Sequence, residues 1–181
     1  RVGPSTGLPT RTQQSDISML YEGSHGETQH IVLIPGTVEE CFEFGWVAFD
    51  CAERFQTPIF GLSDLDLGMN KWACSGFEYP DKPMDRGKVV REKEVFEAFE
   101  TFGRYLDIDG DGIPYRTLPG SGMDPILYRG TGHNPMGVYS EKPDDYRNLM
   151  VRLREKIDNS RDLLPEPLMR EEEDSDIGII Y

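Results

Sequence analysis

The alternation of helical and strand-like segments in the first 72 residues constrains the fold of this chain more than any other feature. Short, mostly apolar runs at 30–35 and 58–63 have the length of strands, and amphipathic stretches at 12–22, 38–55 and 64–71 flank them. Strands that are apolar on both faces are typical of parallel sheets covered by helices. The sequence therefore predicts an α/β fold built on a parallel sheet.

The chain changes character after residue 72. Residues 73–174 are dense in proline and glycine, and two stretches within them predict amphipathic helices. The first helix carries Val95, Phe99, Phe102 and Leu106 on one face, and the second carries Tyr146, Leu149, Met150, Leu153 and Ile157. Residues 175–181 resemble a strand that opens a further domain. We expect three parts, 1–72, 73–174 and 175–181, the middle one an irregular helical connector.

Both ends of the chain predict a longer polypeptide. Arg1 follows no charged leader, apolar segment or cleavage site, and the expected strand ends at Tyr181 with no neighbour to pair with. We therefore expect this sequence to be an excerpt.

Charge and cysteine usage exclude several classes of function. The formal net charge of −14 argues against binding to nucleic acid or to an anionic membrane surface, because both require clustered lysine and arginine. No stretch approaches the roughly 20 apolar residues that span a bilayer. Cys41, Cys51 and Cys74 lack the spacing of zinc or iron–sulfur ligands. We expect reduced thiols in a cytoplasm, with any electron-carrying cluster on another chain.

The helix expected at 38–55 is apolar on two sides. Its main stripe consists of Val38, Cys41, Phe42, Gly45, Phe49, Ala52 and Phe55, and its second stripe of Phe44, Val47 and Cys51. Such a helix is covered on both sides, either centrally within one domain or at a subunit interface. Trp46 stands among acidic residues, and we predict that it lies in a subunit or domain interface.

The opening loop, from Arg1 to Thr10, has the composition of a ligand-binding loop. Glycines permit close approach of the backbone to a ligand, prolines restrict the loop, and the helix that follows offers free amides at its N-terminus. Ser5, Thr6 and Thr10 place hydroxyls beside an arginine, a combination that suits an anion. A strand-to-helix turn without a ligand has the same composition. The loop alone leaves both readings open.

Several motifs, in order, resemble the α subunits of bacterial and archaeal 2-oxoacid:ferredoxin oxidoreductases, and 2-oxoglutarate synthase most of all. The matching segments are the GPSTG-x-PT loop with the following helix at 1–16, a GSHGD-type loop at 21–28, a PG-x-VEECF helix start at 34–42, an AE-x-xQ-x-P turn at 52–59, and the IPYRTLPG segment at 113–120. The likeness is dense up to residue 66 and looser to about residue 159.

The resemblance implies a division of labour between subunits. Residues 1–72 would form part of a domain similar to the pyrimidine-binding domain of thiamine enzymes, while a partner β subunit holds the diphosphate, its magnesium and an iron–sulfur cluster. The enzyme would decarboxylate a 2-oxoacid oxidatively, reduce ferredoxin and form an acyl-CoA from coenzyme A. The family's pyrimidine-contacting glutamate and its YPITP-type motif would both precede Arg1. No catalytic residue can therefore be named within this chain.

The same resemblance assigns the substrate to the opening loop. Arg1 and Thr10 match the positions that contact the 2-oxoacid, and a planar, permanently charged guanidinium suits a carboxylate. Ser5 and Thr6 are weaker candidates, since either hydroxyl can serve the backbone of its own loop.

One acidic loop points to a different function. Asp107, Asp109 and Asp111 precede Gly112 with the spacing of a calcium loop, but the twelfth position is Leu118 rather than a bidentate acid. An ordinary Asp/Gly turn and a weak cation site both fit this pattern, and the cation site would suit a non-catalytic, calcium-stabilised spacer. We expect His25 and His133 to be loop residues rather than ligands.

Overall fold

The structure is a computed structural model of the chain, and it describes residues 13, 15–23, 26, 29–123, 128–170 and 176–178. The elements follow in the order α1 (Ser15–Tyr21), β1 (Ile31–Leu33), α2 (Val38–Phe55), β2 (Ile59–Gly61), α3 (Leu65–Met69), α4 (Lys93–Glu97), α5 (Pro143–Ser160) and the short 3-10 helix η1 (Arg161–Leu163). Helix and strand alternate as far as α3, which confirms the predicted α/β order.

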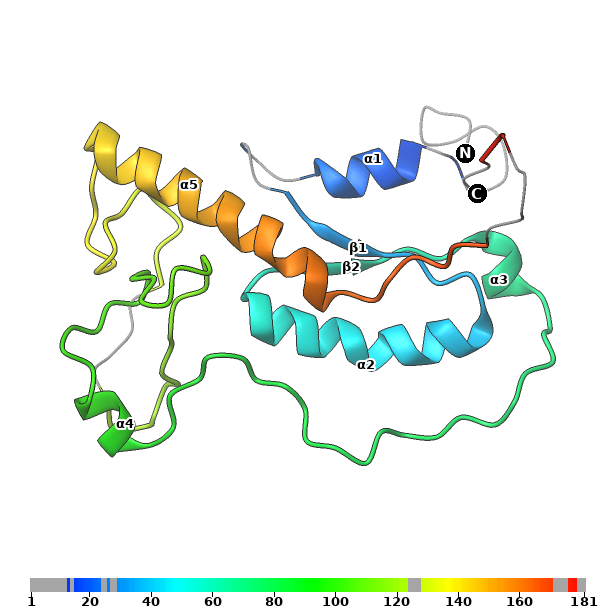
Figure 1. The fold of residues 1–181 in the computed structure, drawn as a ribbon, viewed down its shortest axis with the longest axis horizontal. Coiled ribbons are helices and arrows are strands. Elements are labelled where there is room, and N and C mark those ends of the chain that lie inside the picture. The colour runs from blue at the N-terminus through cyan, green and yellow to red at the C-terminus, as the bar shows by residue number, and fades with distance from the viewer. Residues whose placement is uncertain are drawn as a thin grey trace.

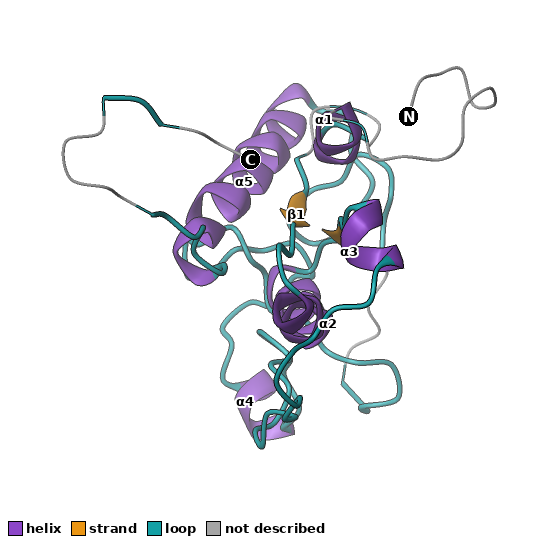
Figure 2. Cartoon of the chain, turned by 90° about the vertical axis from the view of Figure 1, so that its right-hand side faces the viewer, coloured by secondary structure: helices purple, strands orange, loops and turns teal. Residues whose placement is uncertain are grey.

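The two strands form a parallel pair between layers of helix. Ile31 of β1 lies opposite Ile59 of β2, and Leu33 lies opposite Gly61. α2 connects the strands and packs on one side of them, while α1 lies on the other side (Figures 1 and 2). This is the parallel sheet with helical layers that the alternating sequence pattern predicts.

The core lies between this sheet and α2. Ile31 and Leu33 of β1 meet Cys51 and Phe55 of α2, and Ile113 from the connector completes the buried cluster. Phe55 is fully buried, with 0% of its surface exposed. Burial of one such side chain contributes about 1.5–3 kcal/mol, so this short contact fixes α2 against the strands.

The face of α2 that packs on the core is the second stripe rather than the main one. Phe44, Val47 and Ala48 join Cys51 and Phe55 there. Cys41, Gly45 and Phe49 of the expected main stripe are exposed, Phe49 by 64%. The main stripe is interrupted by a glycine without a side chain, and of its members only Phe55 joins the core, where it extends the surface formed by Phe44, Val47 and Cys51.

The first part of the connector, residues 73–92, forms a strap that runs back along α2 (Figure 1). Phe77 stacks on Phe42 with ring centroids 4.8 Å apart, and Tyr79 meets the same ring edge-on at 5.2 Å. The Lys82 ammonium lies 4.4 Å from the centroid of the Trp46 ring. On the face of α2 away from the core, this chain's own connector therefore packs on Phe42 and Trp46, while Phe49 stays exposed, and the placement of Trp46 in a wider interface stays a prediction.

Polar contacts fix the far end of the strap. The Asp85 carboxylate pairs with the Arg54 guanidinium, and the Asp85 amide donates to the Asp50 carboxylate at 2.9 Å. Gly87 has a φ of +57°, and a Cβ added there would lie 2.7 Å from the Cα of Arg54. Only glycine lets the strap approach the helix backbone this closely.

The segment at 113–117 returns to the same end of α2. Arg116 donates to the Glu53 carboxylate, and its amide and carbonyl bond to the strap at Lys88 and Val90. Gln56, which ends α2 in a left-handed conformation, donates from Nε2 to the Pro114 carbonyl at 2.7 Å. Strap, helix end and returning segment thus form one polar junction.

Only one of the two helices expected in the connector forms at its predicted length. α5 extends from Pro143 to Ser160, which confirms the second amphipathic stretch. The first is wrong: α4 covers only Lys93–Glu97, and beyond it Phe99 packs on Phe102 and on Tyr115 as an aromatic cluster. The Tyr105 amide donates to the Pro135 carbonyl at 3.0 Å, and a Cβ at Gly103 would lie 2.8 Å from the same oxygen, so the chain here packs on residue 135 in place of continuing a helix.

The strand expected at 175–181 has no support in the described residues there. Asp176, Ile177 and Gly178 belong to no strand, and the other residues of that segment lie outside the described part. A strand requires a paired neighbour, and the only sheet in the described residues is the β1–β2 pair.

Candidate functional site

The carboxyl ends of β1 and β2 form the candidate site. Both strands point toward the same edge, where Leu33 leads into α2 and Gly61 leads into α3 (Figure 1). In open parallel sheets, ligands bind outside the carboxyl ends of the strands, close to the N-termini of the following helices. This edge is therefore the place in the fold where a ligand is expected.

Side chains cap both helices at this edge. Thr37 accepts from the Glu40 amide at 3.1 Å, while Glu40 reaches back to accept from the Gly36 amide at 2.7 Å. Asp64 accepts from the Leu67 amide at 2.7 Å. The T-x-x-E spacing is the sequence signature of a capping box, and it was available in the sequence at 37–40 without being used. These caps make the edge rigid, and they also occupy amides that would otherwise attract an anion.

The described part of this edge is acidic. Glu39 and Asp66 lie in the first turns of α2 and α3, beside the capping carboxylates of Glu40 and Asp64. Within the described ranges, no three His, Cys, Asp or Glu side chains are arranged to hold a metal ion. These residues do not fit a diphosphate and its magnesium, which would require free amides, cations or a metal-binding cluster.

The substrate-binding residues expected from sequence lie outside the described residues. These are Arg1, Ser5, Thr6 and Thr10, and His25 lies outside as well. The described chain begins just after the loop, where Gln13 and Asp16 exchange hydrogen bonds at the start of α1. α1 runs opposite to β1, so its Ser15 end lies at the carboxyl edge of the strands (Figure 1).

The carboxylates of the loop at 107–112 are engaged by other groups. Asp107 accepts from the amides of Gly110 and Gly112, and Asp109 and Asp111 each lie 2.7 Å from the Lys88 ammonium. Burial acts to lower the pKa of Lys88, but hydrogen bonds to Asp109 and Asp111 outweigh it and raise that pKa. The hydrogen bond with Lys88 likewise lowers the pKa of Asp109. An ammonium from the strap therefore lies between two of the carboxylates considered for calcium.

His133 forms an isolated antiparallel bridge with Tyr139, on either side of a turn, and its ring packs on Tyr105. Its ring centroid is 3.9 Å from that of Tyr105, and its Nδ1 lies 2.8 Å from the Thr131 carbonyl oxygen. Asn134 organises the same turn by accepting from the amides of Met136 and Val138. The imidazole serves local packing in this part of the chain.

Comparison with known proteins decides the family. The model of the thiamine diphosphate-binding domain of pyruvate flavodoxin/ferredoxin oxidoreductases matches residues 1–103, more than half of the chain. The chain belongs to this family. The match begins in the opening loop and ends beyond α4. It includes all of the segment from Ser15 to Met69, which carries α1, β1, α2, β2 and α3 and is called the α1–α3 unit.

The relatives of this chain are subunits of enzymes that act on 2-oxoacids. The α subunit of 2-oxoacid:ferredoxin oxidoreductase 1 of Sulfurisphaera tokodaii is 33% identical over 92% of this chain, and the 2-oxoglutarate synthase subunit KorA of Methanothermobacter marburgensis is 31% identical over 99% of it. The chain spans 26% of the first relative and 46% of the second.

A solved structure has the same fold. The 2-oxoglutarate:ferredoxin oxidoreductase of Magnetococcus marinus, solved with 2-oxoglutarate, coenzyme A and succinyl-CoA bound, matches 92% of this chain and 28% of its own, with a TM-score of 0.78 and 26% identity. The resemblance inferred from the motifs is thereby confirmed.

Proposed function

We propose that this chain acts within the α subunit of a 2-oxoacid:ferredoxin oxidoreductase that converts 2-oxoglutarate and coenzyme A to succinyl-CoA. The observation that supports this most is the likeness along nearly the whole chain to 2-oxoglutarate synthase subunits, together with a solved relative that binds these compounds. The calcium-stabilised spacer has no comparable support, since its acidic loop is engaged by Lys88 and by backbone amides.

The chain's own part in the reaction is to position the substrate. Arg1 would hold the 2-oxoacid carboxylate in one orientation by a bidentate, charge-assisted contact, and Thr10 would add a hydrogen bond from the same loop. Ser5 and Thr6 are secondary candidates for that contact. The start of α1, the first described element after Thr10 in the sequence, lies at the carboxyl edge of β1 and β2, which is the side of a parallel sheet where ligands bind (Figure 1).

Thiamine diphosphate supplies the electron sink for decarboxylation when it is bound. The capped, acidic edge described above does not suit its diphosphate, so we assign the diphosphate, the magnesium and an iron–sulfur cluster to a partner β subunit. Ferredoxin would accept the electrons from that cluster. The rigid α1–α3 unit would then serve as the scaffold for the substrate loop.

We also propose a cytoplasmic location, which the free cysteines support. Cys41, Cys51 and Cys74 are all free thiols, and burial raises the pKa of the Cys51 thiol, which keeps it protonated and unreactive. Across the described helices, none is both long and apolar enough to cross a bilayer.

The test is the substrate preference of the complete enzyme that contains this chain. Ferredoxin reduction would be followed with 2-oxoglutarate, pyruvate and branched-chain 2-oxoacids, each with and without coenzyme A. We expect 2-oxoglutarate to give the highest kcat/KM, with strict dependence on coenzyme A and thiamine diphosphate. Activity with none of the three substrates would overturn the proposed reaction, and a preference for pyruvate would overturn the substrate.

A further inference from the structure

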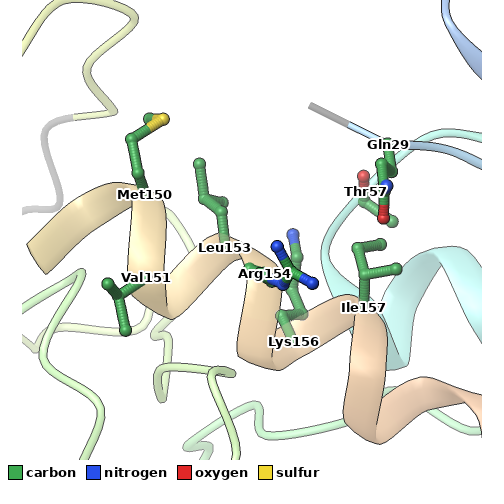
Figure 3. Close-up of a pocket in the computed structure, with 8 residues that line it drawn as sticks. All are labelled: Gln29, Thr57, Met150, Val151, Leu153, Arg154, Lys156 and Ile157. Atoms are coloured by element: carbon green, nitrogen blue, oxygen red, sulfur yellow. The ribbon is translucent and has the colours of Figure 1, made fainter. Parts of the chain in front are cut away.

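A pocket of about 310 Å³ lies against α5, at the end of the strands opposite their carboxyl edge. Its apolar wall is formed by α5, mainly by Met150, Leu153 and Ile157. Gln29, which precedes β1, and Thr57, which precedes β2, form the other wall (Figure 3). Both of these residues come before strands, so the pocket lies toward the amino ends of the sheet. A volume near 300 Å³ is at the lower limit of pockets that hold small molecules.

One lysine that lines this pocket has little exposed surface and no partner among the described residues. Lys156 as a whole residue has 7% of its surface exposed, and its side chain makes no hydrogen bond or ion pair among the residues that the structure describes, but its ammonium nitrogen is not fully enclosed. Buried charges in proteins are normally paired, because removal from water costs several kcal/mol. An unpaired ammonium that lines an open pocket is a feature that an anion would complete.

The charges around Lys156 are predominantly positive. Arg152 on the same helix and Arg104 on the loop after α4 both repel its charge, and burial together with these two residues lowers the pKa of Lys156 to about 8. Asp107 faces Arg152, but its carboxylate oxygens accept from the amides of Gly110 and Gly112. Arg154 also lines the pocket, paired with Asp158 at 3.5 Å. The polar residues on the facing wall, Gln29 and Thr57, carry no charge.

We propose that this pocket binds a small amphipathic carboxylate, with its anionic group on Lys156 and Arg154 and its aliphatic part along Met150, Leu153 and Ile157. The apolar wall favours a carbon chain over a bare anion, and Thr57 and Gln29 can donate to the second carboxylate oxygen. The pocket lies toward the amino ends of β1 and β2, away from their carboxyl edge, and the proposal does not depend on the proposed reaction.

The experiment uses the complete enzyme and three probes: hexanoate, 1-hexanol and inorganic phosphate. Reductive methylation followed by peptide mass spectrometry measures the modification rate of Lys156, with exposed Lys142 as the internal reference. Hexanoate should slow modification of Lys156 at least fivefold and leave Lys142 unaffected. Hexanol and phosphate at the same concentration should have no effect.

Calorimetric titration with hexanoate tests the charge directly. Lys156→Met should weaken binding by about tenfold or more, since it removes a charge-assisted contact, whereas Lys142→Met should not change it. In the parent enzyme the affinity should be constant below about pH 7 and fall by up to about tenfold per pH unit above pH 8, as the lysine loses its proton. Lys156→Arg should bind without that fall.

Three results would overturn the site. One is modification of Lys156 at the same rate with and without hexanoate, which needs no variant and so does not depend on folding of Lys156→Met. The others are equal affinity of parent and Lys156→Met, and protection by phosphate that equals protection by hexanoate. None of these results bears on turnover of 2-oxoglutarate.

Discussion

The α1–α3 unit and the connector are held together by different kinds of contact. In the unit, β1, α2 and β2 meet through adjacent apolar residues such as Ile31, Leu33 and Phe55. In the connector, polar pairs join distant parts of the chain: Arg116 and Glu53 are 63 residues apart. Apolar periodicity predicts contacts of the first kind, and it carries no information about the partner of an individual charge.

The largest loss of unfolding free energy is expected from substitution of a core residue in the α1–α3 unit. Phe55→Ala removes a fully buried ring and should lower the unfolding free energy by about 3–5 kcal/mol. Phe49→Ala, on the same helix but 64% exposed, should change it by less than about 0.5 kcal/mol. Urea titration of the complete subunit, followed by tryptophan fluorescence, measures both. Equal effects would mean that the core does not lie on the Phe55 side of α2.

The next largest loss of stability is expected at Gly112, where the backbone of the connector loop lies close to the backbone of α5. At Gly112, with a φ of +84°, a Cβ would lie 2.4 Å from the Lys156 amide nitrogen, so Gly112→Ala should cost about 2–4 kcal/mol through strain and overlap. Gly110→Ala is the matched control, because its φ is +76° but no atom lies within 4 Å, and it should cost about 1–2 kcal/mol. Hydrogen exchange of the α5 peptide should rise for the first variant only. Similar exchange in both would refute the packing of this loop on α5.

A smaller effect is expected for the ammonium between the two aspartates. Lys88→Met leaves Asp109 and Asp111 without their cation and should cost about 1–2 kcal/mol, while Lys93→Met, whose pair with Glu97 is exposed, should cost less than about 0.5 kcal/mol. Urea titrations of both variants beside the parent measure these costs.

The contribution of Lys88 should also depend on pH. The pKa of Asp109 is lowered in the folded state, so its contribution is present above its unfolded value of about 3.9 and is lost as pH falls. The pKa of Lys88 is raised, so its contribution is present below its unfolded value of about 10.4 and is lost as pH rises further. The stability difference between parent and Lys88→Met should therefore shrink in acid and in strong base. A difference that is the same at pH 3 and pH 7 would contradict the ion pair.

The smallest effect is expected where the strap meets α2. Asp85→Asn weakens the pair with Arg54 at a partly exposed position and should cost about 0.5–1 kcal/mol, with faster hydrogen exchange confined to residues 73–92. Asp81→Asn, an exposed position in the same strap, should leave exchange unchanged. If exchange in the strap is equally fast in the parent and in both variants, the strap is not fixed by Asp85.

Sequence reasoning succeeded where local signals were strong. The bounds of α2 were predicted because its apolar pattern runs from Val38 to Phe55, and α5 was predicted from its apolar stripe. The helix around Phe99 was wrong because the chain there bonds to a distant segment: the Tyr105 amide donates to the carbonyl of Pro135, 30 positions away. Nothing in the local pattern indicated that Lys88 would lie between Asp109 and Asp111. The roles of Arg1 and Thr10 came from the family motif alone and stay predictions.

The central claim is that the opening loop of this chain holds the 2-oxoacid carboxylate. The direct test is kcat/KM for 2-oxoglutarate in the complete enzyme carrying Arg1→Gln, with thiamine diphosphate occupancy and Tm measured on the same sample. We expect a decrease of about 30- to 150-fold, which corresponds to about 2–3 kcal/mol, with the cofactor still bound and Tm unchanged. Arg1→Lys should recover part of the loss, and Thr10→Val should lose about 5- to 12-fold. A kcat/KM within twofold of the parent, or loss of the cofactor in place of substrate affinity, would contradict the claim.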